Sequence, residues 1–200
     1  MDVKAFAGIP TAVLADSQVL GGVMDAGIRP LKENMALLGR ALTCRCVPGD
    51  NLTLHKAITL VQPGDVLVVD CGGCMDCSVL GEMMAICCQV KGVAGVVIDG
   101  CVRDSIALVE MEFPVFVRGI HPKGPTRNLM GTIGEAVECG GVVVEAGDVV
   151  AADADGVVVI KPQEAETVLK KAKAKLDREA ELLPLLRAGH TTWELLHLQD

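Results

Sequence analysis

The sequence predicts an α/β fold with one parallel and one antiparallel sheet, and three observations lead to this class. The 200 residues are 50% hydrophobic but only 2% aromatic, so small aliphatic side chains must fill the core. Short apolar runs alternate with helical patterns up to about residue 117, as in parallel strands joined by crossovers. Residues 140–160 instead repeat strand and turn without a helix. The length gives no reason for a second domain, so we expect one domain over residues 1–200.

The chain begins with a predicted helix and an extended segment. Pro10-Thr11 opens the helix, which runs to about Leu20 and is broken by Gly21-Gly22. Residues 36–47 are expected to be extended, and residues 48–50, Pro-Gly-Asp, form a turn.

The next segment contains the first predicted buried strand. Asn51 is expected to cap a helix that reaches about Val61. The Pro-Gly-Asp turn at 63–65 then leads into an apolar strand at 66–69, and residues 70–73 are expected to form a loop.

A second strand completes a parallel unit. The following helix starts at Ser78 or Gly81 and continues to about Val90, where Gly92 ends it. Residues 94–98 form the next strand, and such a strand–helix–strand unit implies a right-handed crossover.

The remaining elements change from parallel to antiparallel patterns. A short helix is expected over 104–111 and a third parallel strand over 113–117. Apolar runs at 142–144, 149–151 and 156–160 are separated only by turns and predict antiparallel strands.

The C-terminal region, residues 162–198, is predicted to be helical. Pro162 stands at its start, and the apolar positions of the long first helix follow helical spacing while Lys and Glu fill the other face. A final helical turn covers residues 193–198.

Composition and charge exclude several function classes. A formal net charge of −8 without a basic stripe or interleaved aromatic residues argues against a nucleic-acid partner. No apolar run is long enough to span a membrane and the N-terminus does not resemble a signal peptide, so we expect a cytoplasmic protein that binds no membrane. The nine cysteines are then expected to stay reduced.

The predicted ligand site lies where the first two parallel strands end. Ligands of open parallel sheets bind at these strand ends, which places Arg103 and Asp104 beside the segment Gly81-Glu82-Met83-Met84. Main-chain N–H groups at the start of that helix can hold a carboxylate, and the planar guanidinium of Arg103 can grip it from the other side. Asp104 can anchor Mg²⁺ or Mn²⁺, hard cations that need few protein ligands. An Arg-Asp pair taken alone is more often a surface ion pair.

Other chemical signals are weaker. The spacing of Cys71, Cys74 and Cys77 is typical of a zinc or iron–sulfur site, but the fourth ligand is missing. Lys123, Arg118 and Arg127 are interpreted as surface residues, with the entrance of the site as the alternative, and His55 as a partly buried structural histidine.

Several motifs together resemble the RraA-like family, which includes 4-hydroxy-4-methyl-2-oxoglutarate and 4-carboxy-4-hydroxy-2-oxoadipate aldolases. The resemblance covers about residues 49–160 and rests on the stretches PGDNLTLHKAI, QPGDVLVVDCGG, LGEMMA, KGVAGVVIDGCVRD, FPVFVRG and GDVVAADADGVVVI.

The resemblance implies a swivelling β/β/α three-layer fold, a homotrimer or dimer of trimers, and metal-assisted cleavage that yields pyruvate, with oxaloacetate decarboxylation as a side activity. It also implies that residues 81–84 and Arg103 bind a small 2-oxo acid, that Asp104 ligates the metal, and that the C-terminal helix packs on a neighbouring subunit. The acid–base position of the family, usually Asp, is Glu82 here.

Two function hypotheses follow. The first is a divalent-metal-dependent pyruvate aldolase with Glu82 and Arg103 as catalytic residues. The alternative is a non-catalytic RraA-like binding protein that regulates a ribonuclease. The acidic residue at 82 together with Arg103 and Asp104 favours the enzyme, because a binding module has no need for this triad.

Overall fold

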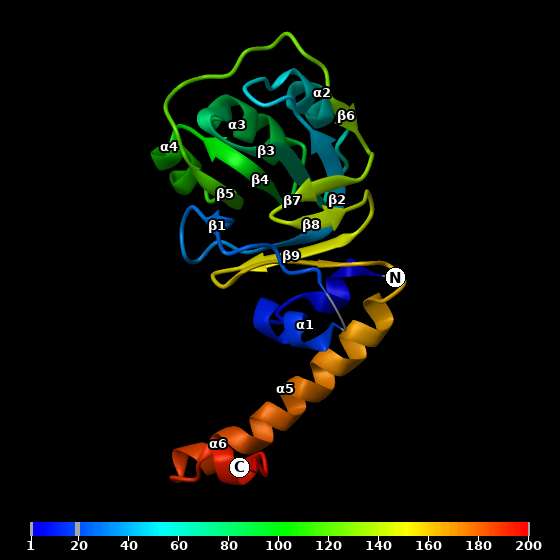
Figure 1. The fold of residues 1–200 in the computed structure, drawn as a ribbon, viewed down its shortest axis with the longest axis vertical. Coiled ribbons are helices and arrows are strands. Elements are labelled where there is room, and N and C mark those ends of the chain that lie inside the picture. The colour runs from blue at the N-terminus through cyan, green and yellow to red at the C-terminus, as the bar shows by residue number, and fades with distance from the viewer. Residues whose placement is uncertain (1, 19–20, 200) are drawn as a thin grey trace.

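The computed structural model describes residues 2–18 and 21–199, and its largest element is one mixed sheet (Figure 1). The strand order is β1-β5-β4-β3-β2-β9-β10, and β6 pairs with β2. The strands are β1 (Arg29–Pro30), β2 (Leu37–Arg45), β3 (Asp65–Leu80), β4 (Gly95–Val102), β5 (Val115–Ile120), β6 (Thr132–Ile133), β9 (Val149–Asp153) and β10 (Gly156–Ile160). A separate antiparallel pair consists of β7 (Val137–Cys139) and β8 (Val142–Val144).

The predicted fold class is confirmed. Strands β2, β3, β4 and β5 run parallel, and β9 is antiparallel to both of its neighbours, β2 and β10. The antiparallel strands over residues 149–160 therefore extend the large sheet, while the small separate sheet comes from residues 137–144.

Helices cover one face of the parallel strands. They are α2 (Leu52–Leu60), α3 (Glu82–Val90) and α4 (Ser105–Glu110), which lie together above the sheet in Figure 1. One face of each strand points toward these helices, so that Leu67, Val69 and Ile98 pack with Leu54, Ala85 and other buried apolar residues.

The opposite strand faces form two further core layers. Val66, Val68 and Phe116 of the parallel strands pack against inward residues of β7, β8, β9 and β10, in a second cluster. The outward faces of β9 and β10 pack on α1 (Thr11–Ser17), on the 3₁₀ helix Val3–Phe6 and on the start of α5 (Ala165–Arg187). Side chains alternate between the two faces of each strand. The β layers can therefore pack on each other in the interior and carry helices on both outer sides.

One predicted loop is wrong. Residues 70–73 do not leave the sheet, because β3 continues to Leu80 and stays paired with β4. The register shifts three times between Asp70 and Leu80, and Gly72 and Gly73 have φ values of 62° and 68°. Glycine adopts these left-handed values without a steric penalty, so an irregular, bulged strand replaces the expected loop.

The predicted cap of α2 is also different. The Asn51 side chain makes no capping bond, and its Nδ2 donates instead to Val79 O (2.8 Å) and Met84 Sδ (3.4 Å). Asp50 Oδ1 accepts the N–H of Leu52 at 2.9 Å. Asn51 therefore ties α2 to the end of β3 and to α3.

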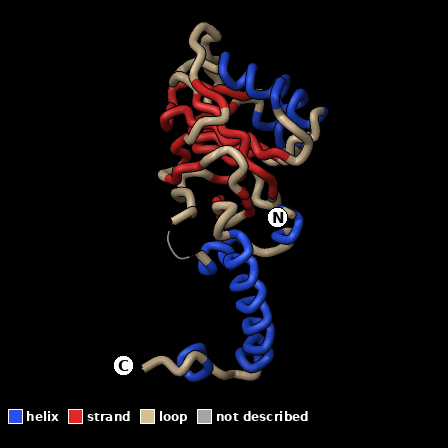
Figure 2. Tube along the Cα trace, turned by 90° about the vertical axis from the view of Figure 1, so that its right-hand side faces the viewer, coloured by secondary structure: helices blue, strands red, loops and turns tan. Residues whose placement is uncertain are grey.

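The long helix α5 extends away from the rest of the molecule and ends in the short helix α6 (Thr192–Leu195), as Figures 1 and 2 show. Only Ala165, Val168 and Ala172 of α5 are buried. Among the described residues, no helix is both long and apolar enough to cross a membrane.

Candidate functional site

The ends of β3 and β4 bring two predicted site segments together. Leu80 pairs with Val102 in the last register of the two strands, and the Arg103 N–H donates to Leu80 O at 3.0 Å. Each strand is followed directly by a helix. β3 leads into α3 after Gly81, and β4 leads into α4 after Asp104. Parallel pairing therefore sets the Arg103-Asp104 pair beside the start of α3, as the sequence predicted.

Asp104 is held in an uncommon backbone conformation. Its φ and ψ of 56° and 38° are left-handed, a region that Asp enters more readily than most residues. The carboxylate Oδ2 accepts the Glu82 N–H at 3.1 Å and lies 3.6 Å from Arg103 Nε. Both side chains keep 42% of their surface exposed, so this ion pair is loose and solvated.

Gly81 allows this approach because it lacks a side chain. A Cβ at position 81 would overlap Asp104 Oδ2 and would lie 3.1 Å from Arg103 Cγ. The φ of Gly81 is −141°, so the close approach and not the backbone angle requires glycine.

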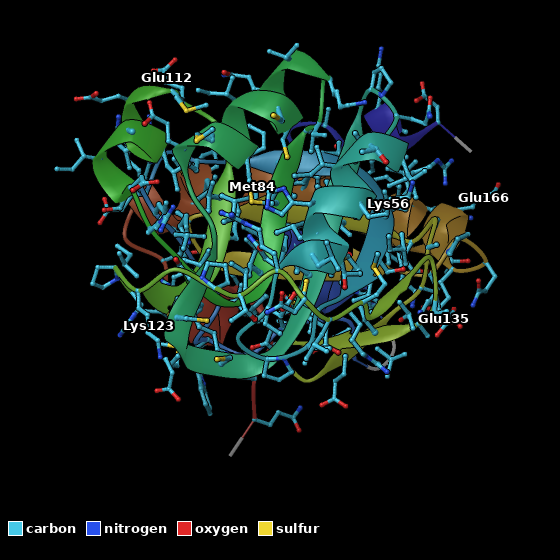
Figure 3. The ribbon with its side chains drawn as sticks, turned by 90° about the horizontal axis from the view of Figure 1, so that it is seen from above. Lys56, Met84, Glu112, Lys123, Glu135 and Glu166 are labelled. Atoms are coloured by element: carbon cyan, nitrogen blue, oxygen red, sulfur yellow. The ribbon has the colours of Figure 1, made fainter. Side chains whose placement is uncertain are left out.

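All six predicted site residues line one cavity of about 310 Å³. Its other lining residues are Asn51, His55, Ser78, Val79, Leu80, Pro125 and Arg127. The Met83 side chain is 82% exposed, whereas Met84 is buried and lies near the middle of the molecule in Figure 3.

The predicted row of free amides is partly used by the protein itself. The Glu82 N–H bonds to Asp104, and the Met84 N–H bonds to Gly81 O at 3.1 Å. Within the described part of the chain, the N–H groups of Gly81 and Met83 have no hydrogen-bond partner. These two donors remain for an anion at the positive end of α3.

Two further cavity residues carry basic side chains. Arg127 was interpreted as a surface residue with the entrance of the site as the alternative, and it is both exposed and part of the cavity lining. His55 was interpreted as a partly buried structural residue, but it is exposed and also lines the cavity. Partial burial still lowers the pKa of His55, and the positive charge of Arg127 lowers it further. No sequence pattern could reveal this, because the two residues are 72 positions apart and meet through tertiary structure.

Two other cationic residues, Arg118 and Lys123, differ from Arg127 in their surroundings. Arg118 is mostly shielded and forms ion pairs with Asp25 (2.7 Å) and Asp99, which raise its pKa. Arg118 is thus a partly exposed structural cation, and it is not among the residues that line the cavity. Lys123 is exposed and lies at the margin of the molecule in Figure 3, which agrees with its interpretation as a surface residue.

Among the predicted site residues, Asp104 is the one that can serve as a ligand of a hard divalent cation. Asp104 Oδ1 has no hydrogen-bond partner among the described residues, so the carboxylate can still accept a ligand. Those residues contain no cluster of three or more His, Cys, Asp or Glu that could hold a metal, the Cys71, Cys74 and Cys77 set included. Mg²⁺ and Mn²⁺ fit such a site, because they bind one carboxylate and complete their shell with water and substrate oxygens.

Comparisons with known proteins match this architecture. The family model RraA-like (Aldolase/RraA) matches residues 11–159. A protein of Halalkalibacterium halodurans is 37% identical over 175 residues, which cover 86% of this chain and 82% of the relative. That relative carries the provisional name 4-hydroxy-4-methyl-2-oxoglutarate aldolase.

Solved structures of RraA proteins share this fold. The RNA-processing inhibitor RraA from Thermus thermophilis is 30% identical with a TM-score of 0.70, over 76% of this chain and 92% of that chain. Streptomyces coelicolor RraAS2, described as an unusual member of the RNase ES inhibitor RraA family, is 28% identical with a TM-score of 0.82. That alignment covers 89% of this chain and 93% of the other.

Proposed function

Because this chain belongs to the RraA-like family, we propose that it is a divalent-metal-dependent lyase acting on small 2-oxo acids. The proposed reaction is the retro-aldol cleavage of substrates of the 4-hydroxy-4-methyl-2-oxoglutarate type to pyruvate, with oxaloacetate decarboxylation as a second activity. The provisional aldolase name of the Halalkalibacterium relative supports this class of reaction.

One observation carries the proposal. A single cavity contains a loosely paired guanidinium, a carboxylate with a free oxygen and unpaired N–H groups at a helix start. These are the groups needed to bind a 2-oxo carboxylate, to hold a cation beside it and to stabilise negative charge.

The residues of the chain bind the substrate and move one proton. Arg103 and the free amides of Gly81 and Met83 hold the substrate carboxylate. Glu82, acting through a water molecule, takes the proton of the 4-hydroxyl group as the C3–C4 bond breaks and the second product becomes a carbonyl compound. The electron pair of the broken bond forms the enolate of pyruvate, and Glu82 returns the proton to C3.

Asp104 would hold Mg²⁺ or Mn²⁺ in this scheme. When bound, the cation supplies Lewis-acid stabilisation of the negative charge that develops on the 2-oxo group. The protein contributes a fixed carboxylate, since the Asp104 backbone and its bond to the Glu82 N–H set the position of that group.

A coupled assay for pyruvate release tests the proposal. Purified protein is supplied with 4-hydroxy-4-methyl-2-oxoglutarate or oxaloacetate, with Mg²⁺, with Mn²⁺ or with excess chelator. We expect turnover with either metal and none with chelator. Turnover that ignores the chelator would rule out the metal-dependent mechanism, and no turnover in folded, metal-loaded protein would rule out the lyase.

Regulation of a ribonuclease is the second candidate function. It is favoured by the likeness to the inhibitor structures from Thermus and Streptomyces. A ribonuclease E-type enzyme assayed with and without this protein tests it, and inhibition by a variant lacking Arg103 and Asp104 would show that this role does not depend on the lyase site.

A further inference from the structure

We propose that Arg127 binds a second carboxylate of the substrate and so selects 2-oxo dicarboxylates over 2-oxo monocarboxylates. The inference rests on the proposed function, because it assumes that the first carboxylate lies at Arg103. It adds a specificity-determining residue on the loop 121–131, which connects β5 to β6 and forms the arch at the top of Figure 1.

Arg127 has the electrostatic freedom that this role requires. No ion pair and no hydrogen bond involves its side chain among the described residues, although the protein carries a net charge of −8. Burial has the larger effect on the pKa of His55 and lowers it. The positive charge of Arg127 reaches this cavity residue and lowers the same pKa further. An unpaired guanidinium beside a cavity can donate two parallel hydrogen bonds to one carboxylate.

The loop is held so that Arg127 lies between two anchors. At one anchor, Lys123 O accepts the N–H (2.9 Å) and the hydroxyl (3.0 Å) of Ser78, which itself lines the cavity. At the other, Asp50 Oδ2 accepts the Thr126 hydroxyl (2.6 Å) and the Asn128 N–H (2.7 Å).

Asp50 is therefore a positioning residue for Arg127. Its carboxylate is 1% exposed and also accepts the N–H groups of Leu52 (2.9 Å) and Leu129 (3.2 Å). Thr126 adds main-chain bonds, donating its N–H to Gly49 O and accepting that of Asn51. A buried carboxylate with four donors fixes the backbone on both sides of residue 127, and such support is what a precisely placed ligand-binding side chain needs.

Two cations in one cavity match a dianion. Arg103 enters from the end of β4 and Arg127 from the loop after β5, while Asp104 and Glu82 supply the negative charges assigned to the metal and the base. With Asp104 paired to a divalent cation, the remaining positive charge is balanced by a substrate with two carboxylates.

The test compares two ligands that differ only in the second carboxylate. Binding of 2-oxoglutarate and of 2-oxopentanoate is measured by calorimetry at constant ionic strength with Mg²⁺, for the wild type and for Arg127→Gln, Arg127→Lys and Lys123→Ala. Lys123→Ala is the matched control, because it removes a cation from the same loop but from an exposed position.

We expect the wild type and Lys123→Ala to prefer 2-oxoglutarate by about tenfold or more, since hydrogen bonds between charged groups are stronger than neutral ones. Arg127→Gln should lose this preference while its affinity for 2-oxopentanoate stays unchanged, and Arg127→Lys should keep part of it. An equal loss for both ligands, or an unchanged preference, would overturn the assignment.

The design separates this inference from the proposed reaction. Binding is measured without turnover, so a dicarboxylate preference that depends on Arg127 would stand even if no pyruvate is released. Pyruvate release without such a preference would instead support the lyase and refute the role of Arg127.

Discussion

Gly81 and Asp104 depend on each other at the scale of single residues. The left-handed backbone of Asp104 turns its carboxylate toward the start of α3, and the missing side chain at position 81 leaves the space that this carboxylate occupies. Placement of the cation in the proposed reaction therefore depends on the missing side chain at position 81.

The substitution Gly81→Ala should displace Asp104 without unfolding the protein. The new methyl group would overlap the carboxylate, and a misplacement near 1 Å can lower activity by about 100-fold. Pyruvate release and the melting temperature are measured together. A wild-type rate would show that the contact has no role, and we expect the melting temperature to change little because residue 81 is partly exposed.

Single residues also show what the sequence could and could not reveal. Arg103 and Asp104 were predictable, because they follow a buried strand at the edge where ligands of parallel sheets bind. For Arg127 the sequence left the surface and the entrance of the site open, because its place at the cavity depends on Asp50, which is 77 positions away in the chain. Neither residue carries a local signal for such a contact.

At the scale of elements, helices and strands followed their local patterns, and the errors concern connections. The helices predicted near 51–61, 81–90 and 104–111 are present as α2, α3 and α4. The loop predicted at 70–73 is an irregular part of β3, because pairing with β4 resumes at Cys74 after a register shift. The two-residue strands β1 and β6 are too short to leave a pattern.

The anchored loop 121–131 gives a prediction about acid stability. Burial alone would raise the pKa of Asp50, but the hydrogen bonds from Asn128, Thr126, Leu52 and Leu129 lower it to about 2. A carboxyl whose pKa is lower in the folded than in the unfolded state stabilises the fold above the unfolded pKa of about 3.9. This contribution is lost as the pH falls from about 4 to about 2.

Urea unfolding of the wild type and of Asp50→Asn at pH 6, 4 and 3 tests this. The variant should be less stable at pH 6, and the difference in unfolding free energy should shrink toward pH 3. The exposed Asp177→Asn serves as control and should show no such convergence. A difference that stays constant or grows on acidification would contradict the account of Asp50.

At the scale of the whole molecule, α5 and α6 stand out, because contacts within this chain do not account for their exposed apolar side chains. They extend from the body in Figures 1 and 2. Several large apolar side chains on them, and on the residues that follow α6, are exposed. These residues are Leu183, Leu185, Trp193, Leu196 and Leu198. We propose that this region packs on a neighbouring subunit of a homotrimer or dimer of trimers, where these side chains would be buried.

The substitutions Leu183→Glu and Leu196→Glu should therefore lower the molar mass measured by light scattering. A charge placed in an apolar subunit contact costs several kcal/mol and should cause dissociation. Lys171→Glu, on an exposed position of the same helix, is the control. An unchanged mass in both leucine variants would show that α5 and α6 do not form the contact.

The central claim is that the Asp104 carboxylate holds the cation on which cleavage depends. It is tested most directly by pyruvate release from 4-hydroxy-4-methyl-2-oxoglutarate, compared between the wild type and Asp104→Asn at saturating Mn²⁺. Asn preserves the size of the side chain and tolerates the left-handed backbone, so the fold should persist. We predict a loss of about 100-fold or more in the variant. An Asp104→Asn protein that releases pyruvate at the wild-type rate would contradict the account.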